Sequence, residues 1–279
     1  MRRRRAPLLA AALLLPAGGA PAQGVPEALR GPWFQGDCAR PAAMLHLTAR
    51  AAARVPEQGE GMLIRFAAMG EAAGWTLGTG AGPEAPRLLL RQAGAALESV
   101  LPDPKTRDDR LPGEAPVERW HRCPTVPPGI AALHGEGVAA LAALEHLEAA
   151  CGAPDTAACL AAILEQGEVA RDGGLSAAEL ARLARGAAWI LAVQEGASGE
   201  RLAAASGLAA LAAAAAARAL LESLDYDGDG RLSAAELAQD RIGFGAASGT
   251  AAGRPMRGEW LAPGLDALRE LLGGIGMGR

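Results

Sequence analysis

The sequence predicts an α+β protein, in which a small antiparallel β barrel or sandwich is followed by an all-helical part. Up to Cys123 the chain consists of short apolar runs broken by Gly, Pro and Asp, and several of these runs alternate apolar with polar residues. Beyond residue 129 almost only helix-forming residues occur, separated by Gly-containing breaks. Residues 125–129, Thr-Val-Pro-Pro-Gly, have the composition of a linker between the two parts.

The first part contains runs of strand length, with turn signals between them at roughly regular intervals. The alternation is clearest in Met62–Phe66 and Trp75–Leu77. Three tryptophans, Trp33, Trp75 and Trp120, are expected in or near the core. The predicted strands are Met44–Ala49, Gly61–Ala68, Gly74–Thr79, Arg87–Gln92, Ala95–Leu101 and Val117–Cys123.

The second part contains one helix whose composition also resembles a membrane span. Leu202–Leu221 carries a single charge, Arg218, over 20 residues. Alanine is barely hydrophobic, however, and Ser206-Gly207 interrupts the run, so we favour a buried, tightly packed helix. The predicted helices are Gly135–Ala150, Asp155–Gln166, Ala177–Gln194, Leu202–Leu224, Ala234–Gln239 and a short one near Leu265–Leu272.

The N-terminus has the three features of a secretory signal peptide. Arg2–Arg5 form a positive region, Ala6–Ala17 form a short apolar region, and Ala20-Pro21-Ala22 offers the small residues that signal peptidase needs. The apolar region is too short for a bilayer, which takes about 20 residues. We expect cleavage after Ala22 and a periplasmic or secreted product. A twin-arginine export route stays open, and the alternative is a basic tail.

Charge and motifs argue against several classes of function. Loss of the four arginines in Arg2–Arg5 takes the formal net charge from −4 to −8. Such an acidic chain has no electrostatic basis for binding nucleic acid or anionic lipid, and we expect no stable membrane insertion after signal cleavage. His134 and His146 are expected on helix surfaces, and no Gly-x-Ser-x-Gly elbow occurs. The sequence therefore indicates no enzyme, with a site inside the β domain as a distant alternative.

Four cysteines occur, and in an oxidising compartment an even number is more often a disulfide set than a metal site. Cys151 and Cys159 flank a Gly-Ala-Pro turn and could join two helices. Cys38 and Cys123 would then close a long loop around the N-terminal region. Four cysteines allow three pairings, of which we favour this one. The C-x-x-C spacing of a zinc site is absent from the sequence.

The segment 225–236 carries oxygen donors at the positions that a calcium-binding loop requires. Calcium takes six to eight hard oxygen ligands, and alternate residues of a tightly curled loop can point theirs at one centre. Gly230, at position 6, permits the sharp bend. Arg231 would contribute its carbonyl, Ser233 a bound water, and Glu236 both carboxylate oxygens. The expected metal ligands are Asp225, Asp227, Asp229, Arg231, Ser233 and Glu236.

Through this loop and a second copy of it, residues 154–240 resemble the EF-hand superfamily. Leu175–Ala181 repeats Leu232–Ala238 residue for residue, which places a second loop at 168–179. This loop is degenerate because Ala170 cannot bind a metal. The resemblance implies an EF-hand pair in which the residues at position 8 of the two loops, Leu175 and Leu232, face each other in a short antiparallel ladder. The loops lie farther apart in sequence than is usual in the family.

Two alternatives to this interpretation of residues 225–236 are a dockerin-type calcium loop and an acidic turn before a helix.

The predicted parts of the chain are a signal peptide (1–22), a disulfide-closed β domain (31–124), a linker (125–135), a helical EF-hand lobe (136–242) and a Gly-rich tail (243–279). We expect an exported protein that binds Ca²⁺ and, through it, a protein partner that the sequence does not identify. The second hypothesis is that calcium only stabilises a periplasmic binding or inhibitor-like protein.

Overall fold

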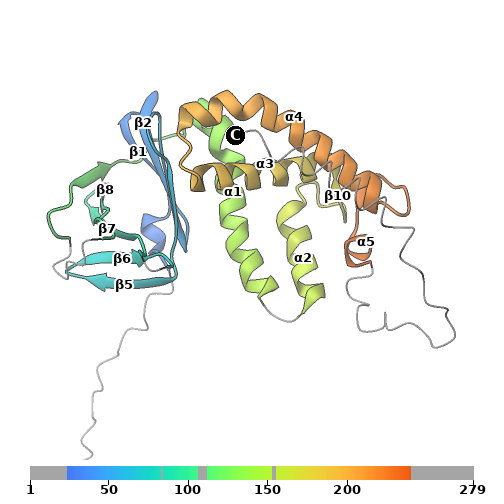
Figure 1. Cartoon of the computed structure of the whole chain (residues 1–279), viewed down its shortest axis with the longest axis horizontal. Helices are drawn as coiled ribbons and strands as arrows, with labels where there is room; N and C mark the ends of the chain where they lie inside the picture. The colour runs from blue at the N-terminus through green and yellow to red at the C-terminus, as the bar shows by residue number, and fades with distance from the viewer. Residues whose placement is uncertain (1–23, 83, 106–111, 153–154, 240–279) are drawn as a thin grey trace, which may run out of the picture. The chain divides into compact units, whose positions relative to one another are not determined.

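A computed structural model of the chain describes residues 24–82, 84–105, 112–152 and 155–239 (Figure 1). By its internal contacts the chain divides into two units, Met1–Leu237 and Ala238–Arg279. The predicted signal peptide (1–22), the tail (243–279) and its helix near residues 265–272 lie outside the described residues. The description below therefore concerns the first unit and the end of its last helix.

Nine strands of the described chain form two antiparallel sheets in which neighbouring strands follow the chain order. The first sheet has the order β1-β2-β3-β4 and the second the order β5-β6-β7-β8-β9. The strands are β1 (Gly31–Asp37), β2 (Arg40–Leu47), β3 (Ala51–Pro56), β4 (Met62–Arg65), β5 (Ala68–Ala72), β6 (Trp75–Thr79), β7 (Arg87–Ala93), β8 (Ala96–Val100) and β9 (Val117–Trp120).

The two sheets share a core without closing into a barrel, as far as the described strands go. The chain passes from β4 to β5 at residues 66–67, and Phe34 of β1 exchanges two backbone hydrogen bonds with His121, just after β9. Trp33 and Trp120 lie in this shared core, Trp75 lies in a smaller apolar cluster with Leu89 and Val100, and all three tryptophans are at most 3% exposed. The α+β class is confirmed. The closed barrel, one of the two predicted alternatives, is not formed by the described strands.

Side chains of the first sheet alternate between two apolar cores. Trp33 and Leu45 point into the core shared with the second sheet, whereas their neighbours Phe34 and Met44 point into a core shared with the helices. This alternation follows from the period-2 geometry of a strand. The first sheet is therefore buried on both faces, between the second sheet and the helices.

The strand β3 (Ala51–Pro56) was not predicted, because alanine favours helices and three alanines open the strand. The structure explains their presence. Ala52 lies in the core between the sheets, Ala51 and Ala53 lie in the core under the helices, and all three are 0% exposed. The central position in a sheet covered on both faces leaves room only for small side chains. β1 and β5 were likewise not predicted.

Five α-helices are described, and they follow the predicted order, with differences at their ends. The predicted linker, 125–135, is too long, because the first helix begins at Pro128. Proline fits the first turn of a helix, where its missing N–H has no intrahelical acceptor. The helices are α1 (Pro128–Cys151), α2 (Thr156–Gly167), α3 (Ala177–Gln194), α4 (Gly199–Leu224) and α5 (Ala234–Ala238).

Helices α1 and α3 cross at a close contact that two glycines permit. A Cβ atom on Gly137 would lie 2.1 Å from Trp189 Cδ2, and one on Gly186 would lie 2.5 Å from Ala140 Cβ. The Trp189 indole nitrogen donates a hydrogen bond of 3.0 Å to Nδ1 of His134, which is 3% exposed. The expectation that His134 lies on a helix surface is wrong, since it faces this contact.

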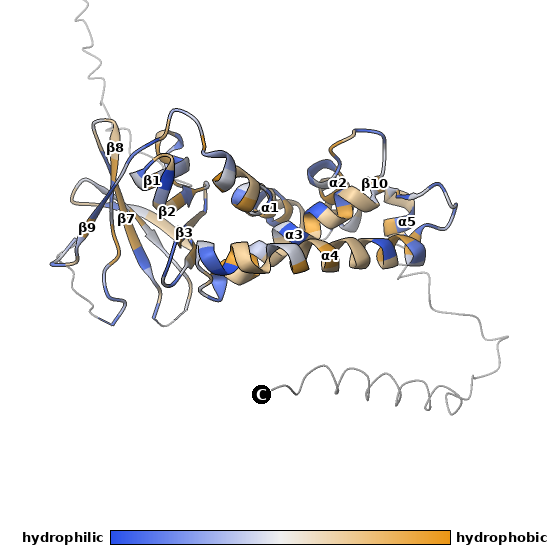
Figure 2. Ribbon diagram, turned by 90° about the horizontal axis from the view of Figure 1, so that it is seen from above, coloured by the Kyte–Doolittle hydropathy of each residue, from blue (hydrophilic) through white to orange (hydrophobic). Residues whose placement is uncertain are grey.

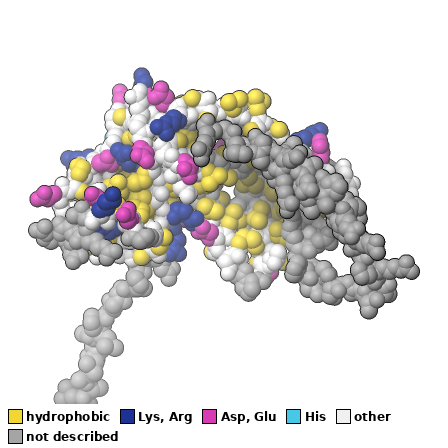
Figure 3. All heavy atoms as spheres, in the orientation of Figure 1, with side chains coloured by type: hydrophobic (Ala, Val, Ile, Leu, Met, Phe, Trp, Pro, Cys, Tyr) yellow, Lys and Arg dark blue, Asp and Glu magenta, His cyan; other side chains and the backbone are white. Residues whose placement is uncertain are grey.

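The prediction that α4 is buried is wrong. Leu208 and Leu211 are 75% and 71% exposed, and Figure 2 colours most of the helix as apolar. Hydrophobic side chains also gather at the surface of the helical part in the space-filling view (Figure 3). Within the described residues, α4 is the one helix long and apolar enough to cross a membrane, and 17% of its most apolar window is buried. Its buried side chains are Leu202, Ala213, Ala217 and Leu221.

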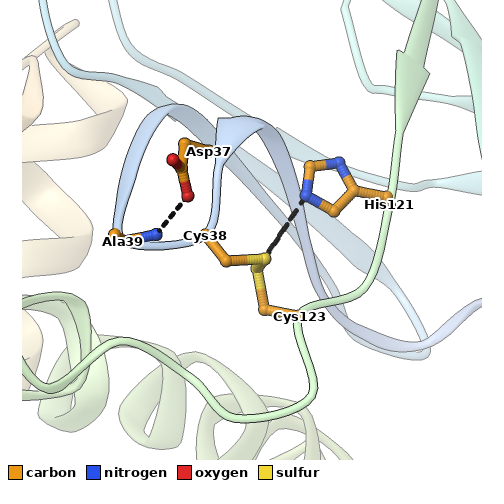
Figure 4. Close-up of a disulfide and its surroundings, with 5 residues drawn as sticks. All are labelled: Asp37, Cys38, Ala39, His121 and Cys123. Atoms are coloured by element: carbon orange, nitrogen blue, oxygen red, sulfur yellow. Dashed lines mark hydrogen bonds between the residues drawn. A yellow bond between two sulfur atoms is a disulfide. The ribbon is translucent and has the colours of Figure 1, made fainter.

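Both disulfides of the favoured pairing are present. Cys38, in the turn between β1 and β2, is bonded to Cys123, just after β9 (Figure 4). Cys151, the last residue of α1, is bonded to Cys159 of α2. The first bond joins the opening hairpin of the first sheet to the segment that leads into the helices. The second holds two consecutive helices together.

Candidate metal centre

The candidate metal loop, 225–236, connects α4 to α5. Helix α4 ends at Leu224, and the two glycines within the loop have positive φ angles, 76° at Gly228 and 84° at Gly230. Residues with side chains rarely adopt this backbone conformation. The loop then forms the two-residue strand β11 (Arg231–Leu232) before α5 begins at Ala234.

Three aspartates converge in this loop. One carboxylate oxygen from each of Asp225, Asp227 and Asp229 lies within 4.8 Å of the other two. Backbone N–H groups hold these side chains: Asp225 accepts hydrogen bonds from Gly228 (2.7 Å) and Gly230 (2.9 Å). Asp227 and Asp229 each accept one from the residue two positions on. Three like charges at such short distances repel one another, and a divalent cation between them would remove that repulsion.

Glu236 points back into the loop from the first turn of α5 and is 7% exposed. One of its carboxylate oxygens accepts hydrogen bonds of 2.8 Å from both the backbone N–H and the hydroxyl of Ser233. The other accepts one of 2.8 Å from the N–H of Tyr226. Hydrogen bonds from Ser233, then from the loop backbone, lower the pKa of Glu236. The carboxylate is therefore ionised and held in place.

The degenerate loop, 168–179, has the same internal hydrogen bonds. Glu179 accepts from the N–H groups of Val169 (2.6 Å) and Ala170 (2.9 Å), and from the N–H and hydroxyl of Ser176 (2.9 and 2.8 Å). Burial alone would raise the pKa of Glu179, but these hydrogen bonds together lower it to about 2. Ala170 has a methyl group where the other loop has the carboxylate of Asp227. The backbone of this loop thus surrounds the carboxylate of Glu179. The loop lacks, however, the carboxylate that Asp227 supplies in loop 225–236.

The two loops pair through β10 (Leu175–Ser176) and β11. Leu175 lies opposite Leu232 in antiparallel register, as expected, and Ser176 lies opposite Arg231. The two leucines are 1% and 0% exposed and belong to a core that includes residues of α3 and α4. The position of each loop therefore depends on its packing and backbone pairing with the other.

An ion pair across the two loops was not anticipated from the sequence. The guanidinium of Arg231 contacts the carboxylate of Asp172, and this pairing raises the pKa of the arginine. The loop pattern predicts only a backbone role for Arg231. The signal that could have revealed the pair is the register itself. Placing Leu175 opposite Leu232 puts Arg231 opposite Ser176, so that its long side chain lies beside the other loop.

The four histidines of the chain lie away from this centre. His46 and His134 are half-buried and buried, and burial lowers the pKa of each to about 4. His146 is exposed on α1, as expected. His121 lies beside the Cys38–Cys123 disulfide. No described histidine contributes to the acidic centre at 225–236.

Comparison with known proteins gave no relative. No protein-family model matches the chain, no curated protein matches it, and no solved structure matches it.

The donor set of loop 225–236 consists of hard oxygens only. Three convergent aspartates, the buried carboxylate of Glu236 and the backbone carbonyls of the loop are ligands of the type that calcium and magnesium prefer. The nitrogen and sulfur ligands that favour zinc or copper are absent from this loop. The residues present therefore fit a hard divalent cation.

Proposed function

We propose that this chain is an exported calcium-binding protein, in which one Ca²⁺ is held by loop 225–236 of an EF-hand-like pair of loops. The observation that carries the proposal is the convergence of Asp225, Asp227 and Asp229 in a loop that also directs Glu236 inward. The ligands would be these four carboxylates, the Arg231 carbonyl and a water held by Ser233.

Calcium is favoured over magnesium by the kind of ligands in the loop. Magnesium needs near-ideal octahedral geometry and keeps several of its waters, whereas calcium accepts a bidentate carboxylate and up to eight oxygens. Glu236 can supply both of its oxygens from a fixed position at the start of α5. The degenerate loop would bind no ion, because Ala170 replaces one carboxylate.

The biological role that we favour is a calcium-dependent interaction with a protein partner. The exposed apolar face of α4, which includes Leu208 and Leu211, ends at the loop that would bind the ion. Ordering of that loop would therefore be transmitted to α4 directly. A structural role for calcium is the second candidate, and the backbone hydrogen bonds that already hold the three aspartates favour it.

Export is supported by two independent features. The N-terminal sequence has the charge and the apolar region of a signal peptide. Both pairs of cysteines form disulfides, which is typical of proteins of an oxidising compartment. Extracellular and periplasmic sites can work at the weak end of the calcium affinity range, roughly 10⁻⁴ to 10⁻³ M.

The test is a calorimetric titration of the exported chain with Ca²⁺ and with Mg²⁺. We expect one Ca²⁺ per chain and much weaker binding of Mg²⁺. Glu236→Gln should lower the calcium affinity most among the ligand variants, because it removes the bidentate carboxylate. Glu222→Gln is the matched control, since Glu222 is an exposed residue of α4 that pairs with Arg218 outside the loop. A Glu236→Gln protein that titrates like the wild type would refute the site.

A second measurement separates the two roles. If calcium regulates an interaction, it should change the fluorescence of an apolar dye such as ANS by exposing or covering hydrophobic surface. If calcium is structural, it should raise the unfolding temperature and leave the dye signal unchanged.

A further inference from the structure

The Cys38–Cys123 disulfide has a histidine beside it. Nε2 of His121 lies 3.4 Å from Sγ of Cys38 and 3.9 Å from Sγ of Cys123 (Figure 4). These three atoms form one of two groups of possible metal-binding side chains in the described part of the chain. The other group is the acidic loop, far along the sequence.

The backbone fixes the histidine in this position. His121 exchanges backbone hydrogen bonds of 2.9 and 3.0 Å with Phe34 of β1, which hold its Cα beside the disulfide at the contact between the two sheets. On the other side, Cys38 lies in the turn between β1 and β2, where Asp37 accepts a hydrogen bond from the Ala39 N–H. All three residues of the group are partly exposed, so that small reagents and ions can reach them.

The distances match those between the ligands of a tetrahedral metal ion. With metal–sulfur bonds of about 2.3 Å and metal–nitrogen bonds of about 2.0 Å, sulfur and nitrogen ligands lie about 3.5 Å apart, and two sulfurs about 3.8 Å apart. The two nitrogen–sulfur distances already lie near this value. Only the two sulfurs would have to separate, by rotation about their Cα–Cβ bonds, once the bond between them is broken.

We propose that, when this disulfide is reduced, Cys38, Cys123 and His121 bind one thiophilic metal ion, Zn²⁺ or Cu⁺. A dithiol reductant supplies two electrons and two protons, becomes a disulfide itself and leaves two protein thiols. The ion displaces both thiol protons to solvent and accepts the lone pair of the imidazole Nε2. Two thiolates and one imidazole are the ligands that these soft ions prefer. Reoxidation by a small disulfide transfers two electrons to it, restores the Cys38–Cys123 bond and releases the ion.

This site is separate from the calcium proposal in place and in chemistry. The acidic loop offers hard oxygens, whereas this group offers sulfur and nitrogen, so the two would select different ions. Binding here would depend on the redox state, because in the oxidised protein both sulfurs are bonded to each other. The protein would thus hold a soft metal only under reducing conditions.

The experiment uses the full exported chain carrying Cys151→Ser and Cys159→Ser, which leaves a single disulfide. The protein is reduced anaerobically with an immobilised phosphine and titrated with Co²⁺, a spectroscopic substitute for zinc. We expect one Co²⁺ per chain, with the intense near-ultraviolet absorption of cobalt–thiolate bonds. Carboxylates do not give this absorption, so ion bound at 225–236 does not contribute to it. Added Zn²⁺ should abolish the signal by displacement.

His121→Ala should weaken binding by more than the roughly 10–100-fold that loss of an outer partner costs, because a direct ligand is removed. His146→Ala is the control, since His146 is exposed on α1, and its binding should equal that of the parent protein. Circular dichroism of the reduced protein should retain the β-sheet signal. The proposal is overturned by unfolding on reduction, by absence of the thiolate absorption, by equal binding to the oxidised protein, or by unchanged affinity in His121→Ala.

Discussion

Leu175→Ala should weaken calcium binding at a site that the leucine does not touch. Leu175 is 1% exposed, lies opposite Leu232, and fills the space above Gly167, where an added Cβ would lie 2.7 Å from its Cδ2 atom. Truncation of such a buried leucine typically costs about 2–5 kcal/mol of stability. The loss falls on the ladder that ties the two loops together, so that calcium must order loop 225–236 without that support.

The expected loss of affinity follows from the share of this energy that calcium must restore. A coupling of about 1–3 kcal/mol corresponds to a fall in calcium affinity of roughly 5- to 150-fold. Calorimetric titration measures it, and urea unfolding of the calcium-free protein measures the stability term separately. Leu191→Ala is the matched control, because Leu191 lies on α3, the helix that follows the ladder, and is 61% exposed. An unchanged affinity in Leu175→Ala, with the stability lowered as expected, would refute the coupling of the loops.

Three further outcomes are expected. Gly137→Ala should destabilise the protein by about 1–3 kcal/mol in urea unfolding, because the new methyl overlaps Trp189. Its control, Gly135→Ala, places a methyl in open space on the same helix and should stabilise the protein by about 1 kcal/mol. Burial lowers the pKa of His134 from 6.5 to about 4, so the neutral imidazole stabilises the fold fully above pH 6.5, and about 3 kcal/mol of the free energy of unfolding should be lost as the pH falls to 4. His134→Asn, which keeps an acceptor, should remove this part of the pH dependence in urea unfolding and leave the part due to His46, whose pKa burial also lowers to about 4. Asp172→Asn should leave one Ca²⁺ per chain and change the titrated affinity less than Leu175→Ala does, because its ion pair is one-third exposed.

The loop at 225–236 could be located from sequence because its chemistry is local. Every donor lies within twelve residues, and the two glycines and the capping pair Ser233 and Glu236 specify the backbone without help from the rest of the chain. The same holds for the start of α3, where Ser176 and Glu179 form a capping box and the predicted and observed helix bounds agree.

What could not be predicted depends on partners distant in sequence. The alanines of β3 form a strand because sheets and helices enclose them on both sides, and no local pattern reports that. The exposure of α4 could not be read from its composition either, since an alanine-rich helix fits equally well in a core, at a surface or in a membrane. The Arg231–Asp172 contact required the register of two loops that are far apart along the chain.

The burial of the first sheet on both faces has a consequence for how the protein unfolds. Phe34 and Met44 pack against Trp189 and Leu141 of the helices, so separating the two parts would expose apolar surface on each. Neither part should then be soluble alone, and the chain should melt in a single cooperative transition. A ligand that binds only the folded state raises the stability of everything that unfolds with it. Calcium bound beyond the end of α4 should therefore delay the thermal unfolding of strands to which it makes no contact.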